Sequence, residues 1–119
     1  MRPEKIFRLT PTDMRSIEQA MEYIDKHYMD KISADCLAIE VELSKAKLQA
    51  GFQKRCGMTL HKYILQVRIT KAKDLLIDTN KPVKAVADKA GFPNESHFCK
   101  VFKKLTAISP GNYRYQQAI

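Results

Sequence analysis

Apolar residues recur at helical spacing along most of this 119-residue chain, and no stretch makes a convincing strand. The first stripe begins at Met14 and ends at Tyr28, and Thr12 or Asp13 can cap the helix that carries it. Six further segments follow, so the pattern predicts an all-α fold of about seven helices. The inward positions that it assigns are Met14, Ile17, Met21, Ile24, Tyr28, Cys36, Leu37, Val41, Leu48, Phe52, Leu60, Tyr63, Ile64, Val67, Ala72, Leu75, Leu76, Val83, Val86, Ala87, Phe98, Val101, Phe102, Leu105 and Tyr113.

Capping residues and turn formers mark the predicted helix ends. Pro82 suits the first turn of a helix, where its missing N–H costs nothing, and Gly57 and Gly91 suit helix ends. The predicted caps are Ser33, Ser44, Thr59, Asn94 and Ser109, the last followed by Pro110.

The pattern of residues from Gly91 to Arg114 already appears once in the chain, fifty residues upstream. Both copies read turn, cap, short helix, basic residues, turn, cap and aromatic residue, and each is about the size of a helix-turn-helix. A duplicated unit predicts a partner that itself repeats, such as double-helical DNA. The matched pairs are Leu48 with Phe98, Phe52 with Phe102, Lys54 with Lys104, Met58 with Ile108, Thr59 with Ser109, and Tyr63 with Tyr113.

The repeat and the longest stripe together predict four regions. Residues 1–12 form an N-terminal arm, residues 13–57 a first helix-turn-helix subdomain, residues 58–78 a linker helix, and residues 79–119 a second helix-turn-helix subdomain. Two helices that read DNA grooves from one rigid body would lie about one DNA turn apart, roughly 34 Å.

The net charge of +8 is unevenly distributed along the chain. Eight acids and three bases lie between Asp13 and Glu42, whereas eight bases and no acid lie between Leu43 and Lys73. After Glu95 there are again only bases. The positive charge therefore falls on the two repeat copies, which favours a polyanionic partner over a merely solvated surface.

The chain has no signal-peptide core and no apolar run of the ~20 residues that span a bilayer, so a cytoplasmic location and no membrane partner are expected. The three cysteines, Cys36, Cys56 and Cys99, are predicted to be reduced packing residues. No Cys/His spacing suits zinc, so neither a metal nor a cofactor is expected, and no small-molecule site is evident.

A set of residues in the second half resembles the DNA-binding domain of the AraC/XylS family of bacterial transcription regulators. The resemblance covers about residues 13 to 115, and Arg68, Ala72, Leu75 and Leu76 look like the linker helix of that family. The matching motifs are Val86-Ala87, Gly91-Phe92, Phe98, Phe102-Lys103-Lys104, Ser109-Pro110 and Tyr113-Arg114, in the family's order and spacing.

The resemblance implies a function in transcription. It implies a sequence-specific, double-stranded DNA-binding regulator of AraC type that inserts two recognition helices into successive major-groove segments of one DNA face. By the habit of the family it would be an activator, with RNA polymerase as a further partner. The domain is expected to be monomeric, cytoplasmic and associated with the nucleoid.

In the second recognition helix, the family's base-facing positions carry Glu95, Ser96, Cys99 and Lys100. Lys100 can donate to guanine O6 and N7, although the family more often has arginine there. Glu95 either accepts from cytosine N4 or only favours the helix dipole. Ser96 reads a base or helps to cap, and His97 contacts phosphate or flanks the groove.

In the first recognition helix, the corresponding positions carry Lys45, Ala46, Gln49 and Ala50. Gln49 suits adenine N6 and N7. The two alanines contact thymine methyl groups or allow close backbone approach, while Lys45 and Lys47 supply charge.

Two departures make the first copy look less regular than the second. Gly51 costs about 1 kcal/mol relative to alanine inside a helix, and Val41 stands where the family usually has a turn glycine. The first copy is therefore expected to contribute affinity more than sequence discrimination.

The remaining polar and basic residues of both copies are candidate backbone contacts, which position a protein on DNA and make binding salt-dependent. Arg68 is expected to be structural, and Phe52, Phe102 and Tyr113 are expected in the core and not to stack on bases. The DNA-facing set is completed by Gln53, Lys54, Arg55, Lys103, Lys104 and Arg114.

Two other classes of protein fit the sequence less well. An enzyme would need a nucleophile with its base, a phosphate-binding glycine loop or paired carboxylates, and none is seen. An RNA-binding or protein-docking module would expose aromatic residues on its basic faces, whereas the aromatic residues here fall on inward stripes.

Overall fold

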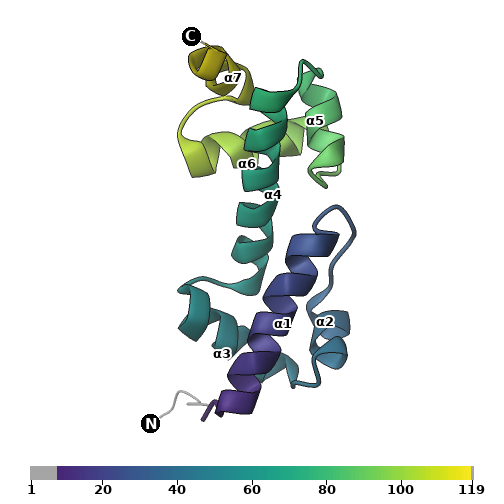
Figure 1. Ribbon diagram of the computed structural model, residues 1–119, viewed down its shortest axis with the longest axis vertical. Helices are drawn as coiled ribbons and strands as arrows, with labels where there is room; N and C mark the ends of the chain where they lie inside the picture. Colours follow the sequence, from purple (N-terminus) through teal and green to yellow (C-terminus); the bar gives the residue numbers. More distant parts are fainter. Residues whose placement is uncertain (1–7, 119) are drawn as a thin grey trace. The chain divides into compact units, whose positions relative to one another are not determined.

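A computed structural model describes residues 8–118, and this part contains seven α-helices and no strand (Figure 1). The all-α prediction is confirmed. The helices are α1 (Pro11–His27), α2 (Ala34–Glu40), α3 (Lys45–Cys56), α4 (Leu60–Asp78), α5 (Val83–Lys89), α6 (Glu95–Thr106) and α7 (Pro110–Ala118).

Five of the predicted caps are confirmed by hydrogen bonds between a side-chain oxygen and a backbone N–H three residues later. Such bonds satisfy donors that have no partner within the helix. The pairs are Ser33 with Cys36, Ser44 with Lys47, Thr59 with Lys62, Asn94 with His97, and Ser109 with Asn112.

The beginning of α1 differs from the prediction. Thr10 is the cap: its hydroxyl accepts from Asp13 N–H at 3.0 Å, and the Asp13 carboxylate accepts from Thr10 N–H at 3.0 Å. This reciprocal pair is a capping box, which places Pro11 in the first turn, so the assignment to Thr12 or Asp13 was wrong. The predicted arm, residues 1–12, lies outside the described residues up to position 7, and its last two residues belong to α1.

The described residues divide into two compact units, with residues 8–26 and 32–63 in the first and residues 27–31 and 64–118 in the second. Helix α4 begins in the first unit and belongs to the second from Ile64 onward. In the first unit the fully or nearly fully buried apolar residues are Ile17, Ala20, Ile24, Leu37, Ala38, Val41, Leu48, Phe52 and Leu60.

The second unit is built around a run of aromatic rings. Phe92 packs on Phe98, Phe98 on Phe102, and Phe102 on Tyr113, with ring centroids 5.1, 5.6 and 5.5 Å apart. Residues of α4 and α5 complete this core, among them Ile69, which the sequence pattern missed. The expectation that the repeat aromatic residues belong to the core is confirmed for Phe102, while Tyr113 packs at its edge.

Two details of the predicted pattern were wrong. Cys36 is exposed on α2, whereas Cys56 and Cys99 are half-buried, and all three are free thiols. Pro82 precedes α5 as its cap residue and does not lie in its first turn.

Gly51 has a packing reason that its helix propensity hides. A Cβ atom at Gly51 would overlap the side chain of Ile17 on α1, so glycine permits the close approach of α1 and α3.

The alignment of the turn between α2 and α3 with the turn between α5 and α6 was also predicted wrongly. Leu43 N–H donates to Ala38 O, as Phe92 N–H donates to Ala87 O, which aligns Glu42 and not Val41 with Gly91. Glu42 accordingly has a φ of 60° and Gly91 a φ of 93°. The offset between copies is forty-nine residues at the turn and fifty after it, because Pro93 adds one residue to the second copy.

Candidate nucleic-acid interface

Helices α3 and α6 begin in the same way and bury the same face. Ser44 caps α3 and Asn94 caps α6, each from an extended backbone conformation. Leu48 with Phe52, and Phe98 with Phe102, are fully buried at the repeat-related positions of the two helices. Burying this stripe leaves the opposite face of each helix in solvent, because residues four apart share a face.

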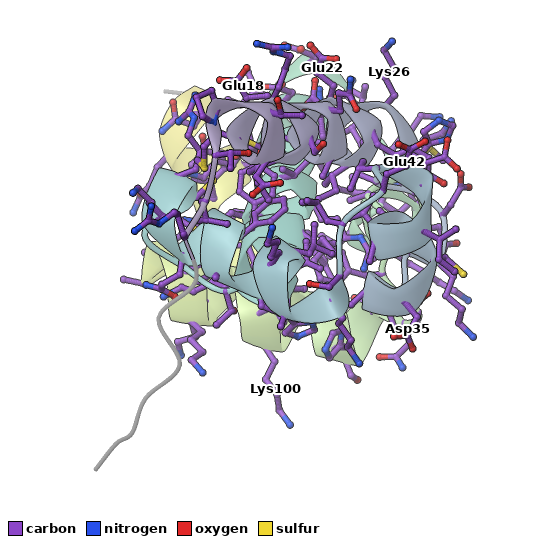
Figure 2. All side chains as sticks on the ribbon, turned by 90° about the horizontal axis from the view of Figure 1, so that it is seen from below. Glu18, Glu22, Lys26, Asp35, Glu42 and Lys100 are labelled. Carbon is purple, nitrogen blue, oxygen red and sulfur yellow. The ribbon has the colours of Figure 1, made fainter. Side chains whose placement is uncertain are left out.

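The exposed face of α6 carries most of the residues that were predicted to contact DNA from this helix. Glu95, Ser96 and Lys100 are exposed, and the Lys100 side chain extends away from the helix into solvent (Figure 2). His97 is exposed as well, with its ring 5.7 Å from that of Phe92. The first turn of α6 therefore presents an acceptor, a hydroxyl and an imidazole, and its second turn a free ammonium group.

Cys99 does not fit this outward face as well as its neighbours. It is half-buried and packs against the core of the second unit. Burial raises the pKa of the Cys99 thiol, and the nearby Glu95 carboxylate raises it further. Cys99 is thus a neutral packing residue that reaches the surface only in part.

The exposed face of α3 is poorer in hydrogen-bonding groups. Lys45, Ala46 and Gln49 are exposed, while Ala50 is half-buried. Lys47 is also half-buried, and its ammonium group lies 3.1 Å from the Asp13 carboxylate on α1. Gln49 is therefore the one residue among Lys45–Ala50 that offers an exposed amide.

The candidate phosphate contacts fall into two groups. Gln53, Lys54, Lys103 and Lys104 are exposed, and they take part in no ion pair within the described residues. Arg55 is exposed but lies 3.9 Å from the Glu18 carboxylate. The second half of each helix thus presents free positive charge, at Lys54 in α3 and at Lys103 and Lys104 in α6.

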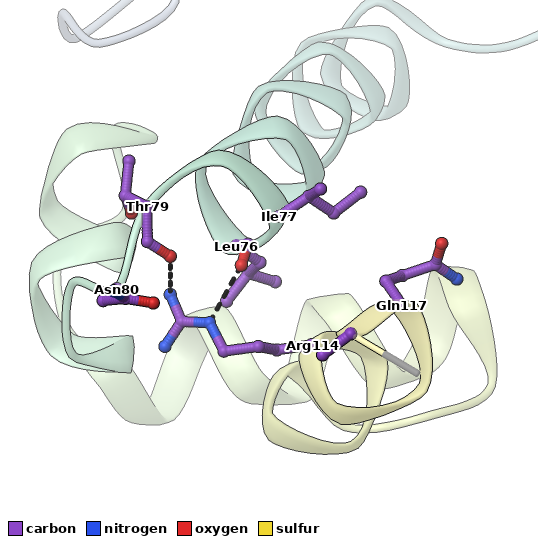
Figure 3. Close-up of a pocket in the computed structure, with 7 residues that line it drawn as sticks. Leu76, Ile77, Thr79, Asn80, Arg114 and Gln117 are labelled. Atoms are coloured by element: carbon purple, nitrogen blue, oxygen red, sulfur yellow. Dashed lines mark hydrogen bonds between the residues drawn. The ribbon is translucent and has the colours of Figure 1, made fainter.

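Arg114 has a structural contact that the sequence analysis did not expect. Its Nε donates to Leu76 O at 2.9 Å and its terminal NH2 donates to Thr79 O at 3.2 Å (Figure 3). The guanidinium group thereby satisfies carbonyls at the C-terminal end of α4, beside a small hollow that Asn80 and Gln117 also line. This contact ties Arg114 to α4.

Arg68 repeats this arrangement elsewhere in the same unit. Its Nε donates to Tyr28 O at 2.7 Å, and its terminal NH2 donates to Asp30 O at 2.9 Å. Burial lowers the pKa of Arg68, whose guanidinium group donates to these two backbone carbonyls. The structural role predicted for Arg68 agrees with these bonds.

Sequence reasoning missed the carboxylates that face α3. Asp13 and Glu18 come from α1 and Asp35 from α2, more than nine residues away from the bases that they contact. The available signal was the acid-rich segment before the base-rich one, but charge patterning along a chain does not show which residues meet.

Residues 8–118 contain neither a cluster of metal ligands nor a membrane-spanning helix. No group of three or more His, Cys, Asp or Glu side chains there could hold a metal ion. None of the helices described is long and apolar enough to cross a bilayer.

Known proteins match most of the chain. A family model described as a helix-turn-helix domain matches residues 37–116. The chain is 32% identical over 117 residues to the xylose operon regulatory protein of Escherichia coli (strain K12), which covers 94% of this chain and 30% of that protein. It is 36% identical over 102 residues to the bifunctional transcriptional activator/DNA repair enzyme AdaA of Bacillus subtilis (strain 168), which covers 86% of this chain and 48% of that protein. The chain thus spans less than half the length of either relative.

A solved structure shares the fold. A transcriptional regulator from Chromobacterium violaceum, described among AraC-type DNA-binding domain-containing proteins, superposes with a TM-score of 0.83 at 25% sequence identity. The match covers 92% of this chain and 97% of that one, so it concerns the complete fold and not one helix-turn-helix alone.

Proposed function

This chain belongs to the AraC/XylS family of helix-turn-helix transcription regulators, and from that premise we propose that it binds specific sequences of double-stranded DNA with α3 and α6. The observation that carries the proposal is the repeated helix with one buried face and one polar, exposed face. Since such a helix fits the major groove, two of them suit successive segments of that groove.

Helix α6 is proposed as the stronger reader of base sequence. Lys100 is exposed and unpaired among the described residues, so its ammonium group is free to donate to guanine O6 and N7. Glu95 is proposed to accept from cytosine N4, with Ser96 beside it. Their exposure in the first turn supports these roles, because residues at the start of a recognition helix contact base edges.

Helix α3 is proposed to contribute less discrimination. Gln49 would read adenine, and Ala46 and Ala50 would contact thymine methyl groups or allow the backbone to approach. Lys54, Lys103 and Lys104 are proposed phosphate contacts, with Gln53 beside Lys54. Phosphate contacts fix the register on DNA and carry little sequence information.

The regulatory role is also proposed. Activation is supported by the relative AdaA, which is described as a transcriptional activator. An activator at a promoter would meet RNA polymerase, and the chain is proposed to bind DNA as a monomer with its two units on successive half-sites. The net charge of +8 favours such a complex, since it attracts a polyanion.

Selection of bound sites from a randomised duplex pool tests the proposal. Two preferred half-sites about one helical turn apart, roughly 10 base pairs, are expected. Affinity for the selected duplex should fall steeply between 50 and 200 mM salt, because each neutralised phosphate contributes a slope of about −0.9 to the log–log plot. The proposed function would be contradicted if no sequence were enriched, or if the affinity did not change with salt.

Two lysine variants separate base reading from phosphate contact. Lys100→Ala should relax the preference at one position of the site, costing about 1–3 kcal/mol there. Lys104→Ala should weaken all sequences alike and reduce the salt slope by about one. Coinciding base-preference profiles for the two variants would contradict these roles.

A further inference from the structure

Three of the four cations on α3 lie against carboxylates of their own unit. Lys47 Nζ is 3.1 Å from Asp13 Oδ2, Lys45 Nζ is 3.4 Å from Asp35 Oδ1, and Arg55 Nε is 3.9 Å from Glu18 Oε2. The carboxylates come from the two helices that pack around α3, namely α1 and α2. The recognition helix of the first unit is therefore largely neutralised before it meets DNA.

The corresponding helix of the second unit lacks this feature. Lys100, Lys103 and Lys104 make no ion pair within residues 8–118, and the acid nearest in sequence, Glu95, lies five residues before Lys100. The two helices carry similar numbers of bases, so the difference lies in their surroundings and not in their own composition.

The pair between Lys47 and Asp13 is the most firmly held of the three. Asp13 also accepts from Thr10 N–H in the capping box, which fixes its carboxylate at the start of α1. The Asp13 side chain is 13% exposed and that of Lys47 36%. The hydrogen bond from Thr10 lowers the pKa of Asp13, and that from Lys47 lowers it further, so the carboxylate is charged at neutral pH.

We propose that Asp13, Glu18 and Asp35 restrain the electrostatic attraction of α3 to DNA, by occupying cations that would otherwise bind phosphate. The inference rests on the proposed function and deepens it. Exposed ion pairs are worth about 0–1 kcal/mol each, so DNA can displace them, but each displacement reduces what a phosphate contact gains.

The consequence is a lower affinity of the first unit for DNA of any sequence. Phosphate contacts supply nearly all of the non-specific affinity, whereas base contacts do not depend on the carboxylates. The three carboxylates therefore weaken binding at specific and non-specific sites by a similar factor, which shortens the time spent on each non-specific site. Discrimination between sequences is left to the base contacts.

Charge-neutral variants of the two exposed carboxylates test the proposal. Asp35→Asn and Glu18→Gln release Lys45 and Arg55. Glu40→Gln and Glu22→Gln make the same change of net charge at exposed acids that form no ion pair with any residue from 8 to 118. Glu22 lies one turn from Glu18 on the outer side of α1, which makes it a matched control (Figure 2). Asp13 is left unchanged because it also caps α1.

Affinity for a duplex of random sequence is measured at 50 to 200 mM salt for all four variants and the unaltered chain. Asp35→Asn and Glu18→Gln should each steepen the salt slope by about one. Over that range of salt, the affinity of each variant should therefore fall by a further factor of roughly three compared with the unaltered chain. The two controls should leave the slope unchanged. Equal slopes for all five proteins, or equal changes in all four variants, would overturn the inference.

A double-mutant cycle places the effect on one pair. Lys45→Ala should leave the slope of the unaltered chain nearly unchanged, but should lower that of Asp35→Asn by about one. Lys104→Ala should lower the slope equally in both backgrounds. If the unaltered chain binds duplex DNA and Lys45→Ala acts alike in both backgrounds, this inference fails while the proposed function stands; if the chain binds no duplex, both fail.

Discussion

The two helix-turn-helix units have two left-handed backbone positions in common. Each unit has glycine at one of the two positions, but not at the same one. At the turn between the two helices, the first unit has Glu42 with φ 60° and the second has Gly91 with φ 93°. At the end of the recognition helix, the first unit has Gly57 with φ 71° and the second has Ala107 with φ 73°. The hydrogen bonds at these positions match between the units, so the packing of the helices dictates the conformation even where the residue type opposes it.

The cores of the two units differ in their aromatic content. Among residues 8–118, Phe52 of the first unit packs on one aromatic ring, that of Tyr63, at 5.3 Å. Within the same residues, Phe102 of the second unit packs on two, those of Phe98 and Tyr113. Ring pairs of this kind add about 0.5–1.5 kcal/mol each beyond the area that they bury, so Phe102 gains more from these ring contacts than Phe52 gains from Tyr63.

The largest expected effect comes from removing these central rings. Phe102→Ala should lower the free energy of unfolding by about 3–5 kcal/mol, and Phe52→Ala should cost less because it breaks one ring pair instead of two. Urea unfolding, followed by the NMR signals of each unit, measures both losses. A greater loss for Phe52→Ala would reverse this ranking of the two cores.

The turn glycine gives the next largest effect. Gly91→Ala forces alanine to a φ of 93° and brings its Cβ within 2.5 Å of Tyr28 O, so a loss of about 2–4 kcal/mol is expected. Glu42→Gly should instead stabilise the first unit by about 1 kcal/mol, since glycine adopts the left-handed region without strain.

Thermal unfolding of the two turn variants gives the comparison. Opposite shifts of the melting temperature are expected, downward for Gly91→Ala and upward for Glu42→Gly. A downward shift for both would mean that the Glu42 side chain contributes more than its backbone strain costs.

The smallest expected effects are at the ends of the recognition helices. Ala107→Gly should stabilise the second unit by about 1 kcal/mol, and Gly57→Ala should destabilise the first by a similar amount. A Cβ at Gly57 meets nothing within 4 Å, so this pair of variants isolates the cost of the left-handed backbone itself. Chemical denaturation of the two variants should give changes of opposite sign and similar size, and any other result would implicate side-chain contacts at Ala107.

Much of the fold could be read from the sequence because its signals are local. The stripe that buries Leu48 and Phe52, and its copy at Phe98 and Phe102, needs only residues within one helix. Caps such as Asn94 act on an N–H three residues away. Thr10 also caps a helix by accepting from an N–H three residues later. It was missed because the apolar stripe begins only at Met14, so the helix was predicted to start too late in the chain.

Contacts between distant segments were beyond the sequence. The hydrogen bonds that Arg114 donates to the carbonyls of Leu76 and Thr79 could not be read from the sequence. Helix propensity alone makes Gly51 unfavourable, whereas in the structure the missing side chain leaves room for Ile17. In both cases the deciding partner lies more than thirty residues away along the chain.

The sequence by itself determined the number of helices, their buried faces and the duplication, because helical periodicity and capping depend on neighbours within a few residues. Only the tertiary structure decided which basic residues are free. Ion pairs such as that of Lys47 with Asp13 join residues 34 positions apart, and their formation depends on how α1 and α3 pack. The alignment of the first turn was settled in the same way, by backbone hydrogen bonds that place Glu42 where the repeat alone had placed Val41.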